Sequence, residues 1–108
     1  MNNKEIALKN IDVFQREIDR VVTETEKMKK VLENLGWEIK LSSGYLNSTV
    51  ECTASKEVGK DKRIVFKKRA KCHKNDVFIR EFGDYLALAK VYTEIKEWEN
   101  QEIYENVK

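Results

Sequence analysis

The densest group of like-charged side chains in this 108-residue sequence lies between residues 56 and 74, where nine basic residues stand against two acidic ones. Basic and apolar residues alternate over 63–72, so we expect a β-strand there, with its cations on the face opposite the core. A row of cations on a twisted strand can follow a phosphate backbone and release counterions, which makes the affinity salt-dependent. The sequence therefore predicts a polyanion-binding surface, with nucleic acid as the first candidate partner. The residues assigned to this surface are Lys60, Lys62, Arg63, Lys67, Arg69, Lys71 and Lys74.

The same cations have a second interpretation, as a solubilising face or as an edge-strand guard against sheet-to-sheet aggregation. Which interpretation holds depends on the acids that lie beside the row. If the strands over 46–55 and 63–72 pair across the Gly59 turn so that their buried faces match, Glu51 lies opposite Lys67 and neutralises it. The other cations of the row are then expected to be unpaired.

Nucleophilic or metal chemistry would need the two cysteines and the single histidine of the chain. Cys72 and His73 are adjacent at a strand exit, where neighbouring side chains point to opposite faces, so a thiolate–imidazole pair is disfavoured. Cys52 falls on a buried strand position. Two cysteines without a CxxC spacing are also a poor ligand set for zinc. We interpret both cysteines as reduced core thiols and expect neither a metal nor a cofactor.

Acid–base catalysis would need carboxylates that are grouped in a site and shielded from solvent. Most carboxylates instead lie on predicted helix faces beside lysines four residues further on, as in Glu5 with Lys9 and Glu26 with Lys30. The sequence holds none of the motifs that mark phosphate-binding loops, dinucleotide folds, serine hydrolases or zinc proteases. We therefore predict a non-enzymatic protein with no small-molecule substrate.

A long helix is the first of the elements that must position the cationic strand. Its apolar residues alternate spacings of three and four, the a/d pattern of a packed helix, at Ile11, Phe14, Ile18, Val21, Thr25, Met28, Leu32 and Leu35. Asn2 or Asn3 can cap its start, with Glu5 three residues after Asn2. Gly36 provides a left-handed stop, so we expect a helix that runs to Leu35.

The apolar stripe of this helix has two interpretations. Val22 and Val31 widen it toward the face of a helix that packs on its own domain, and this intramolecular packing is the default. The helix is longer than the predicted closing helix, however, so part of it would lack an intrachain cover. A coiled-coil homodimer is the alternative, with contacts from Ile11, Phe14, Ile18, Val21 and Met28.

An antiparallel meander follows the long helix. Alternation with a period of two predicts strands over 37–41, 46–55, 63–72 and 77–82, the last of them short. The faces of the fourth strand cannot be assigned from periodicity. Burial of Phe78 and Phe82 is the default, because phenylalanines are commoner in cores; if both instead face solvent beside the cations, they add a platform for stacking bases.

The chain then closes with a second helix, for which Asp84 is a good N-cap. Its apolar stripe is Leu88, Val91, Tyr92, Ile95 and Trp98. We predict an α+β fold over 1–108 as a single domain: a long N-terminal helix, an antiparallel meander of three to four strands and a C-terminal helix, with both helices on one face of the sheet.

Composition adds a source and a location to these expectations. Charged residues make up 37% of the chain, and its formal net charge of +2 divides into 0, +5 and −3 over 1–36, 37–82 and 83–108. Lysine outnumbers arginine and proline is absent, a usage typical of AT-rich phage or mobile-element genes. With no long apolar run and no signal-peptide pattern at the start, we expect a cytoplasmic protein with no membrane contact. The alternative to polyanion binding is a phage-encoded inhibitor or adaptor that binds a host protein and dimerises through the N-terminal helix.

Overall fold

The residues described by the computed structural model are 2–44, 48–71 and 79–107. Helix α1 spans Asn3–Asn34. Asn2 caps its start, because the side-chain Oδ1 accepts a hydrogen bond from the Glu5 backbone N–H at 2.8 Å. The long N-terminal helix and its cap are therefore confirmed.

A tight turn ends α1 and directs the chain into the core. Gly36 takes the left-handed conformation, with a φ of +97°. Its N–H donates to Glu33 O at 3.0 Å, and the Trp37 N–H donates to Leu32 O at 3.0 Å, so two carbonyls of the last turn are satisfied. Because Leu32 and Trp37 are both buried, the predicted stop also fixes the first core residue after the helix.

Three antiparallel strands form one sheet with the order β1-β2-β3. Their bounds are Glu38–Gly44 for β1, Thr49–Gly59 for β2 and Lys62–Lys71 for β3. The predicted alternation is confirmed, because the inward positions of β2 and β3 include the buried Val50, Cys52, Ala54 and Ala70. The sheet is the meander expected from the sequence.

The register between β2 and β3 differs from the prediction by two residues. Ala54 lies opposite Phe66, whereas the predicted pairing across the Gly59 turn places it opposite Ile64; the observed ladder also has an irregularity between Glu57 and Gly59. The turn is shorter than expected, because only Lys60 and Asp61 separate the two strands. Asp61 has a φ of +66°, which allows so tight a reversal.

Helix α2 spans Arg80–Val107, so it begins before the predicted N-cap Asp84. The fourth strand expected over 77–82 is therefore wrong from residue 80 onward, where the chain is helical. Residues 77 and 78 lie outside the described part of the chain. Among the described residues the sheet has three strands, the lower of the two numbers that the sequence predicts.

Phe82 gives a physical reason for the early start of α2. Its ring packs edge-on against Phe14 of α1, with 6.1 Å between the ring centroids. Gly83 lies inside the helix, and its N–H donates to Ile79 O at 3.2 Å. A glycine in a helix costs about 1 kcal/mol relative to alanine, and the aromatic contact offsets that cost.

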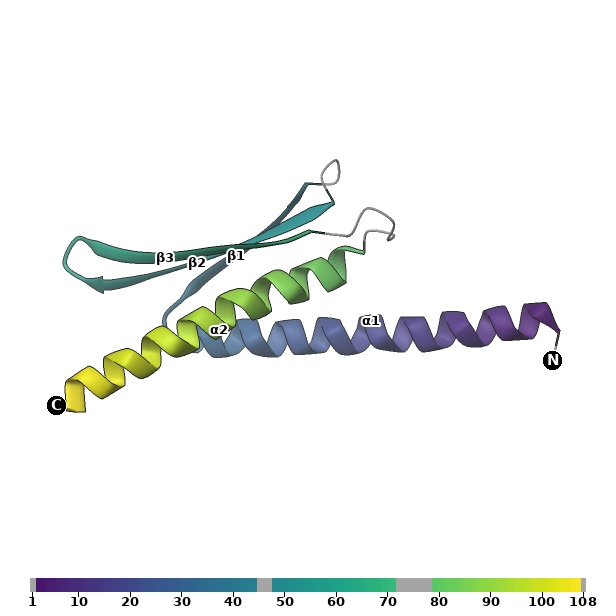
Figure 1. Cartoon of the computed structure of the whole chain (residues 1–108), viewed down its shortest axis with the longest axis horizontal. Helices are drawn as coiled ribbons and strands as arrows, with labels where there is room; N and C mark the ends of the chain where they lie inside the picture. The colour runs from purple at the N-terminus through teal and green to yellow at the C-terminus, as the bar shows by residue number, and fades with distance from the viewer. Residues whose placement is uncertain (1, 45–47, 72–78, 108) are drawn as a thin grey trace.

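The sheet forms one layer and the two helices cover one of its faces (Figure 1). Helix α2 lies along β2 and β3, whereas α1 packs against α2 and β1. The helices run in the same direction, and α1 extends beyond both α2 and the sheet toward its N-terminus (Figure 1). The predicted α+β arrangement is confirmed.

The core lies between α2 and the inner face of the sheet. The predicted apolar stripe of α2 is confirmed, because Leu88, Val91 and Ile95 are buried and Tyr92 and Trp98 pack against them. Small side chains allow the helix to approach the strands closely. The buried alanines of this contact are Ala54, Ala70 and Ala87.

The free energy of unfolding is expected to fall as the pH rises, because Asp84 becomes ionised in a partly buried position. Its Oδ1 is buried and has no hydrogen-bond partner in the described part of the chain. Burial raises the pKa of Asp84 above 3.8, although Arg80 opposes this effect. The folded state therefore binds the proton more tightly than the unfolded chain, and this contribution is lost as the pH rises through the folded pKa. Asp84→Asn should melt a few degrees above the parent at about pH 7 and match it at about pH 3; equal differences at both pH values would contradict this account.

Candidate nucleic-acid interface

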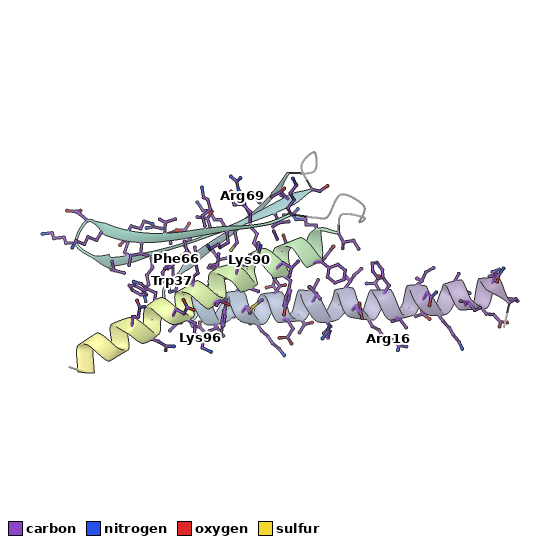
Figure 2. The ribbon with its side chains drawn as sticks, viewed as in Figure 1. Arg16, Trp37, Phe66, Arg69, Lys90 and Lys96 are labelled. Atoms are coloured by element: carbon purple, nitrogen blue, oxygen red, sulfur yellow. The ribbon has the colours of Figure 1, made fainter. Side chains whose placement is uncertain are left out.

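The outward face of the sheet carries most of the cations predicted to bind a polyanion. Because side chains alternate along a strand, Arg63, Lys67, Arg69 and Lys71 share one face of β3, and all four are exposed. Figure 2 shows Arg69 on the side of the sheet away from the helices, whereas Phe66 of the same strand points toward α2. We call these four cations the β3 row.

Arg63, at one end of the β3 row, is held by acids from the other two strands. Its Nη2 donates to Glu38 Oε2 at 2.7 Å and to Ser55 Oγ at 2.9 Å, and its Nη1 donates to Glu57 Oε1 at 3.4 Å. The prediction that Arg63 is unpaired is therefore wrong, because Glu38 reaches it from β1. Arg63 has little free charge to offer a ligand.

Lys67 and Arg69 share one carboxylate, that of Glu51. Arg69 Nε lies 2.7 Å from Glu51 Oε2, and Lys67 Nζ lies 3.7 Å from Glu51 Oε1. The sequence predicts only the Lys67 pair, but the observed register places Arg69 opposite Glu51. The hydrogen bond from Arg69 holds the pKa of Glu51 below its usual value, and the charge of Lys67 acts in the same direction while burial partly opposes both. Two cations on one carboxylate leave a positive charge at this point.

The remaining predicted cations lie toward the ends of β3. Lys60 lies in the β2–β3 turn, Lys62 begins β3 and Lys71 ends it; all three are exposed, and none forms an ion pair with a described residue. Lys74 lies outside the described part of the chain. The outward strand positions that carry charge are Glu38, Lys40, Glu51, Glu57, Arg63, Lys67, Arg69 and Lys71.

These outward positions hold five cations and three carboxylates, which gives the sheet face a net charge of +2. The turn adds Lys60 and Lys62 against Asp61, so the described surface reaches +3. The interface is therefore more nearly balanced than the nine-to-two composition of the basic segment indicates. Its excess charge is concentrated at the turn and from Lys67 to Lys71.

Two lysines of the basic segment point inward and bind α2, a role that sequence reasoning missed. Lys56 Nζ lies 3.0 Å from Glu99 Oε1, and Lys68 Nζ lies 2.6 Å from Glu94 Oε1. The signal was present in the sequence, because both lysines share the phase of the core positions of their strands while the closing segment is acidic. Part of the positive charge is thus neutralised within the fold.

Of the two alternatives for Phe82, burial is the one that the structure shows, because this residue is partly buried on α2 against Phe14. Phe78 lies outside the described residues. Base stacking beside the β3 row therefore has no support from Phe82.

Cys52 is fully buried, as predicted. Burial, with a smaller contribution from the charge of Asp84, raises the pKa of its thiol to about 11. The thiolate form is therefore scarce at neutral pH, which disfavours nucleophilic chemistry. Cys72 and His73 lie outside the described part of the chain. Within the part that is described, no group of three or more His, Cys, Asp or Glu side chains is placed to hold a metal ion.

The stripe of α1 divides into a covered and an uncovered half. Val21 is buried and Met28 packs against the core, so the default prediction of intramolecular packing is confirmed for this half. These two residues are unavailable for self-association in this fold. Ile18 is partly exposed, whereas Ile11 and Phe14 are exposed.

Comparisons with protein-family models, with curated proteins and with solved structures find no match for this chain. Within the described residues, neither helix has a stretch apolar and long enough to cross a membrane.

Proposed function

We propose that this protein is a non-enzymatic, cytoplasmic binding module that engages a polyanion, with nucleic acid as the first candidate, through the β3 row and the β2–β3 turn. The observation that carries the proposal is that three consecutive outward residues of β3, Lys67, Arg69 and Lys71, are cations, whereas Glu51, which pairs with the first two, is the one described carboxylate that pairs with any of them. Lys60 and Lys62 extend this surface through the turn. A phage or mobile-element source is supported by composition alone.

The ion pairs of Lys67 and Arg69 with Glu51 are exposed enough for a phosphate to compete with the carboxylate. The side chain of Arg69 is 70% exposed and that of Lys67 is 57% exposed. Ion pairs at such positions are weak because water and salt screen them. A phosphate can therefore reach Arg69 and Lys67 directly from solvent, while Glu51, whose side chain is 24% exposed, loses part of its counter-charge.

The net charge of the surface sets the expected salt dependence. The net charge of +3 corresponds to about three phosphates neutralised, which gives a slope of log K against log[salt] of about −2.1 for single strands and about −2.7 for duplexes. We expect fluorescence anisotropy with labelled single-stranded and duplex DNA and RNA to detect binding at about 50 mM salt and an affinity about 20- to 40-fold lower at about 200 mM. Absence of binding at the lower salt concentration would overturn the proposal.

Two variants assign the binding to this surface. Lys67→Gln/Arg69→Gln/Lys71→Gln should abolish it, whereas a control with the same loss of charge on α1 should not: Lys9→Gln/Lys27→Gln/Lys30→Gln. Glu51→Gln should tighten binding a few-fold and steepen the salt slope by about one, because it releases two cations. Weaker binding by Glu51→Gln, or an equal loss in the α1 control, would contradict the assignment.

A second candidate function is the binding of a host protein as an inhibitor or adaptor. The observation that favours it is the exposed apolar surface of α1, which includes Ile11 and Phe14. A folded protein that fails to bind any of the labelled nucleic acids would make this candidate the leading one.

A further inference from the structure

The N-terminal half of α1 projects from the fold, and no other described part of the chain covers it (Figure 1). Every residue over 3–17, which we call the projecting segment, is exposed. An isolated helix of this length is marginal in water. The projecting segment nevertheless exposes five large apolar side chains to solvent: Ile6, Leu8, Ile11, Val13 and Phe14.

The apolar stripe of the projecting segment continues the stripe that α2 covers further along the same helix. Val21, Thr25 and Leu32 of that stripe are buried inside the molecule. Ile11 and Phe14 occupy the preceding a and d positions, yet Ile11 is 61% exposed. A seven-residue period fits a second helix rather than a flat surface or a small ligand, so the missing cover is helical.

We propose that the projecting segments of two copies pair antiparallel about a two-fold axis and make this protein a homodimer. In this arrangement Ile11 packs against the partner's Phe14, and Ile18 packs against the partner's Ala7. Ile18 is partly covered by its own chain, so little space is left above it. Ala7 has the smallest side chain of the stripe and is therefore the residue that fits against Ile18 of the other copy. The two sheets then lie at opposite ends of the helix pair.

The apolar area available agrees with what a dimer of this size needs. Leu8, Ile11, Phe14 and Leu86 are each about half exposed, and Leu86 follows Phe82, the residue that packs on Phe14, by one turn of α2. Four such side chains expose on the order of 400 Å² per copy. A standard interface takes about 800 Å² from each partner, a little over half of it apolar, so polar flanking residues would supply the rest.

Charge does not oppose the pairing of the projecting segment with itself. It carries three bases and three acids, which are Lys4, Lys9, Arg16, Glu5, Asp12 and Glu17. Figure 2 shows Arg16 pointing away from the side of α1 on which α2 and the sheet lie. Two copies of a neutral segment bring no net repulsion, and antiparallel helices also have opposed dipoles. A second copy is therefore the occupant that the surface fits.

Sedimentation analysis of the full chain tests the dimer. The parent should show twice the 12.7 kDa mass of one chain, with a dissociation constant at or below about 10 µM. Leu8→Gln/Ile11→Gln should stay helical and weaken the dimer by about 100-fold or more. A control removes a similar apolar area from the sheet, Val58→Gln/Val65→Gln, and should leave the dimer unchanged. A monomeric parent, or a Leu8→Gln/Ile11→Gln variant that dimerises as the parent does, would overturn the proposal.

Cysteine cross-linking tests the direction of the pair. Ala7→Cys and Ile18→Cys are made in separate chains and oxidised mildly, alone and mixed. In the antiparallel arrangement only the mixture should give a high yield of a disulfide-linked dimer, because residue 7 faces the partner's Ile18 position. Efficient cross-linking of either variant with itself would overturn this arrangement in favour of a parallel pair.

Discussion

Trp37→Ala is expected to lower the free energy of unfolding by about 3–5 kcal/mol, a large share of the roughly 5–15 kcal/mol typical of such a domain. Trp37 is 2% exposed. Its ring lies 5.6 Å from that of Phe66 and 5.7 Å from that of Trp98, measured between centroids. Truncation would leave a cavity where α1, the sheet and α2 meet, and the rings around it would lose most of their contacts.

Urea denaturation followed by far-ultraviolet circular dichroism measures this loss, because the midpoint falls in proportion to the lost free energy when the slope is unchanged. Trp37→Phe is the matched comparison. It keeps an aromatic ring but loses the hydrogen bond from Nε1 to Glu99 Oε1 at 3.1 Å, and we expect a loss of about 1–2 kcal/mol. Val65→Ala, at an exposed position of β3, should cost less than about 0.5 kcal/mol. A loss near that of Val65→Ala for Trp37→Ala would show that the aromatic cluster contributes little.

The sequence predicts this core well because burial follows periodicity. The heptad stripe, Gly36 and the change to a period of two at Trp37 locate α1, its end and the start of the sheet. Each signal is local, so it needs no knowledge of the neighbouring elements. The inward phase of β2 and β3 follows from the same alternation.

The candidate site was harder to predict because cross-strand neighbours depend on register. A shift of two residues leaves every inward side chain inward, so the hydrophobic pattern could not distinguish Lys67 from Arg69 as the residue opposite Glu51. The acid that holds Arg63 comes from β1, a strand away. The start of α2 was missed for a related reason, since the Phe14–Phe82 contact joins residues far apart in the chain.

Glu99 of α2 forms an ion pair with Lys56 of β2 and so joins this helix to the sheet. Its removal is the second change expected to have a large effect. Lys56 Nζ lies 3.0 Å from Glu99 Oε1, with the two side chains 23% and 22% exposed. The same ammonium lies 5.7 Å from the centroid of the Trp37 ring and 5.9 Å from that of Trp98. The lysine is thus held by a carboxylate and two aromatic faces in a partly dehydrated position.

Glu99→Gln should cost about 1–3 kcal/mol, because it leaves the partly buried Lys56 cation without its counter-charge. The double variant Lys56→Met/Glu99→Gln should recover most of that loss, because it removes the cation together with the carboxylate and keeps an amide oxygen that can accept the Trp37 Nε1–H bond. A double-mutant cycle by urea denaturation therefore predicts a coupling energy above about 1 kcal/mol, whereas the exposed Lys27–Glu24 pair should couple by less than about 0.5 kcal/mol. Equal coupling in the two cycles would mean that Lys56 and Glu99 behave as surface charges, and the contact between α2 and the sheet would then depend on apolar packing alone.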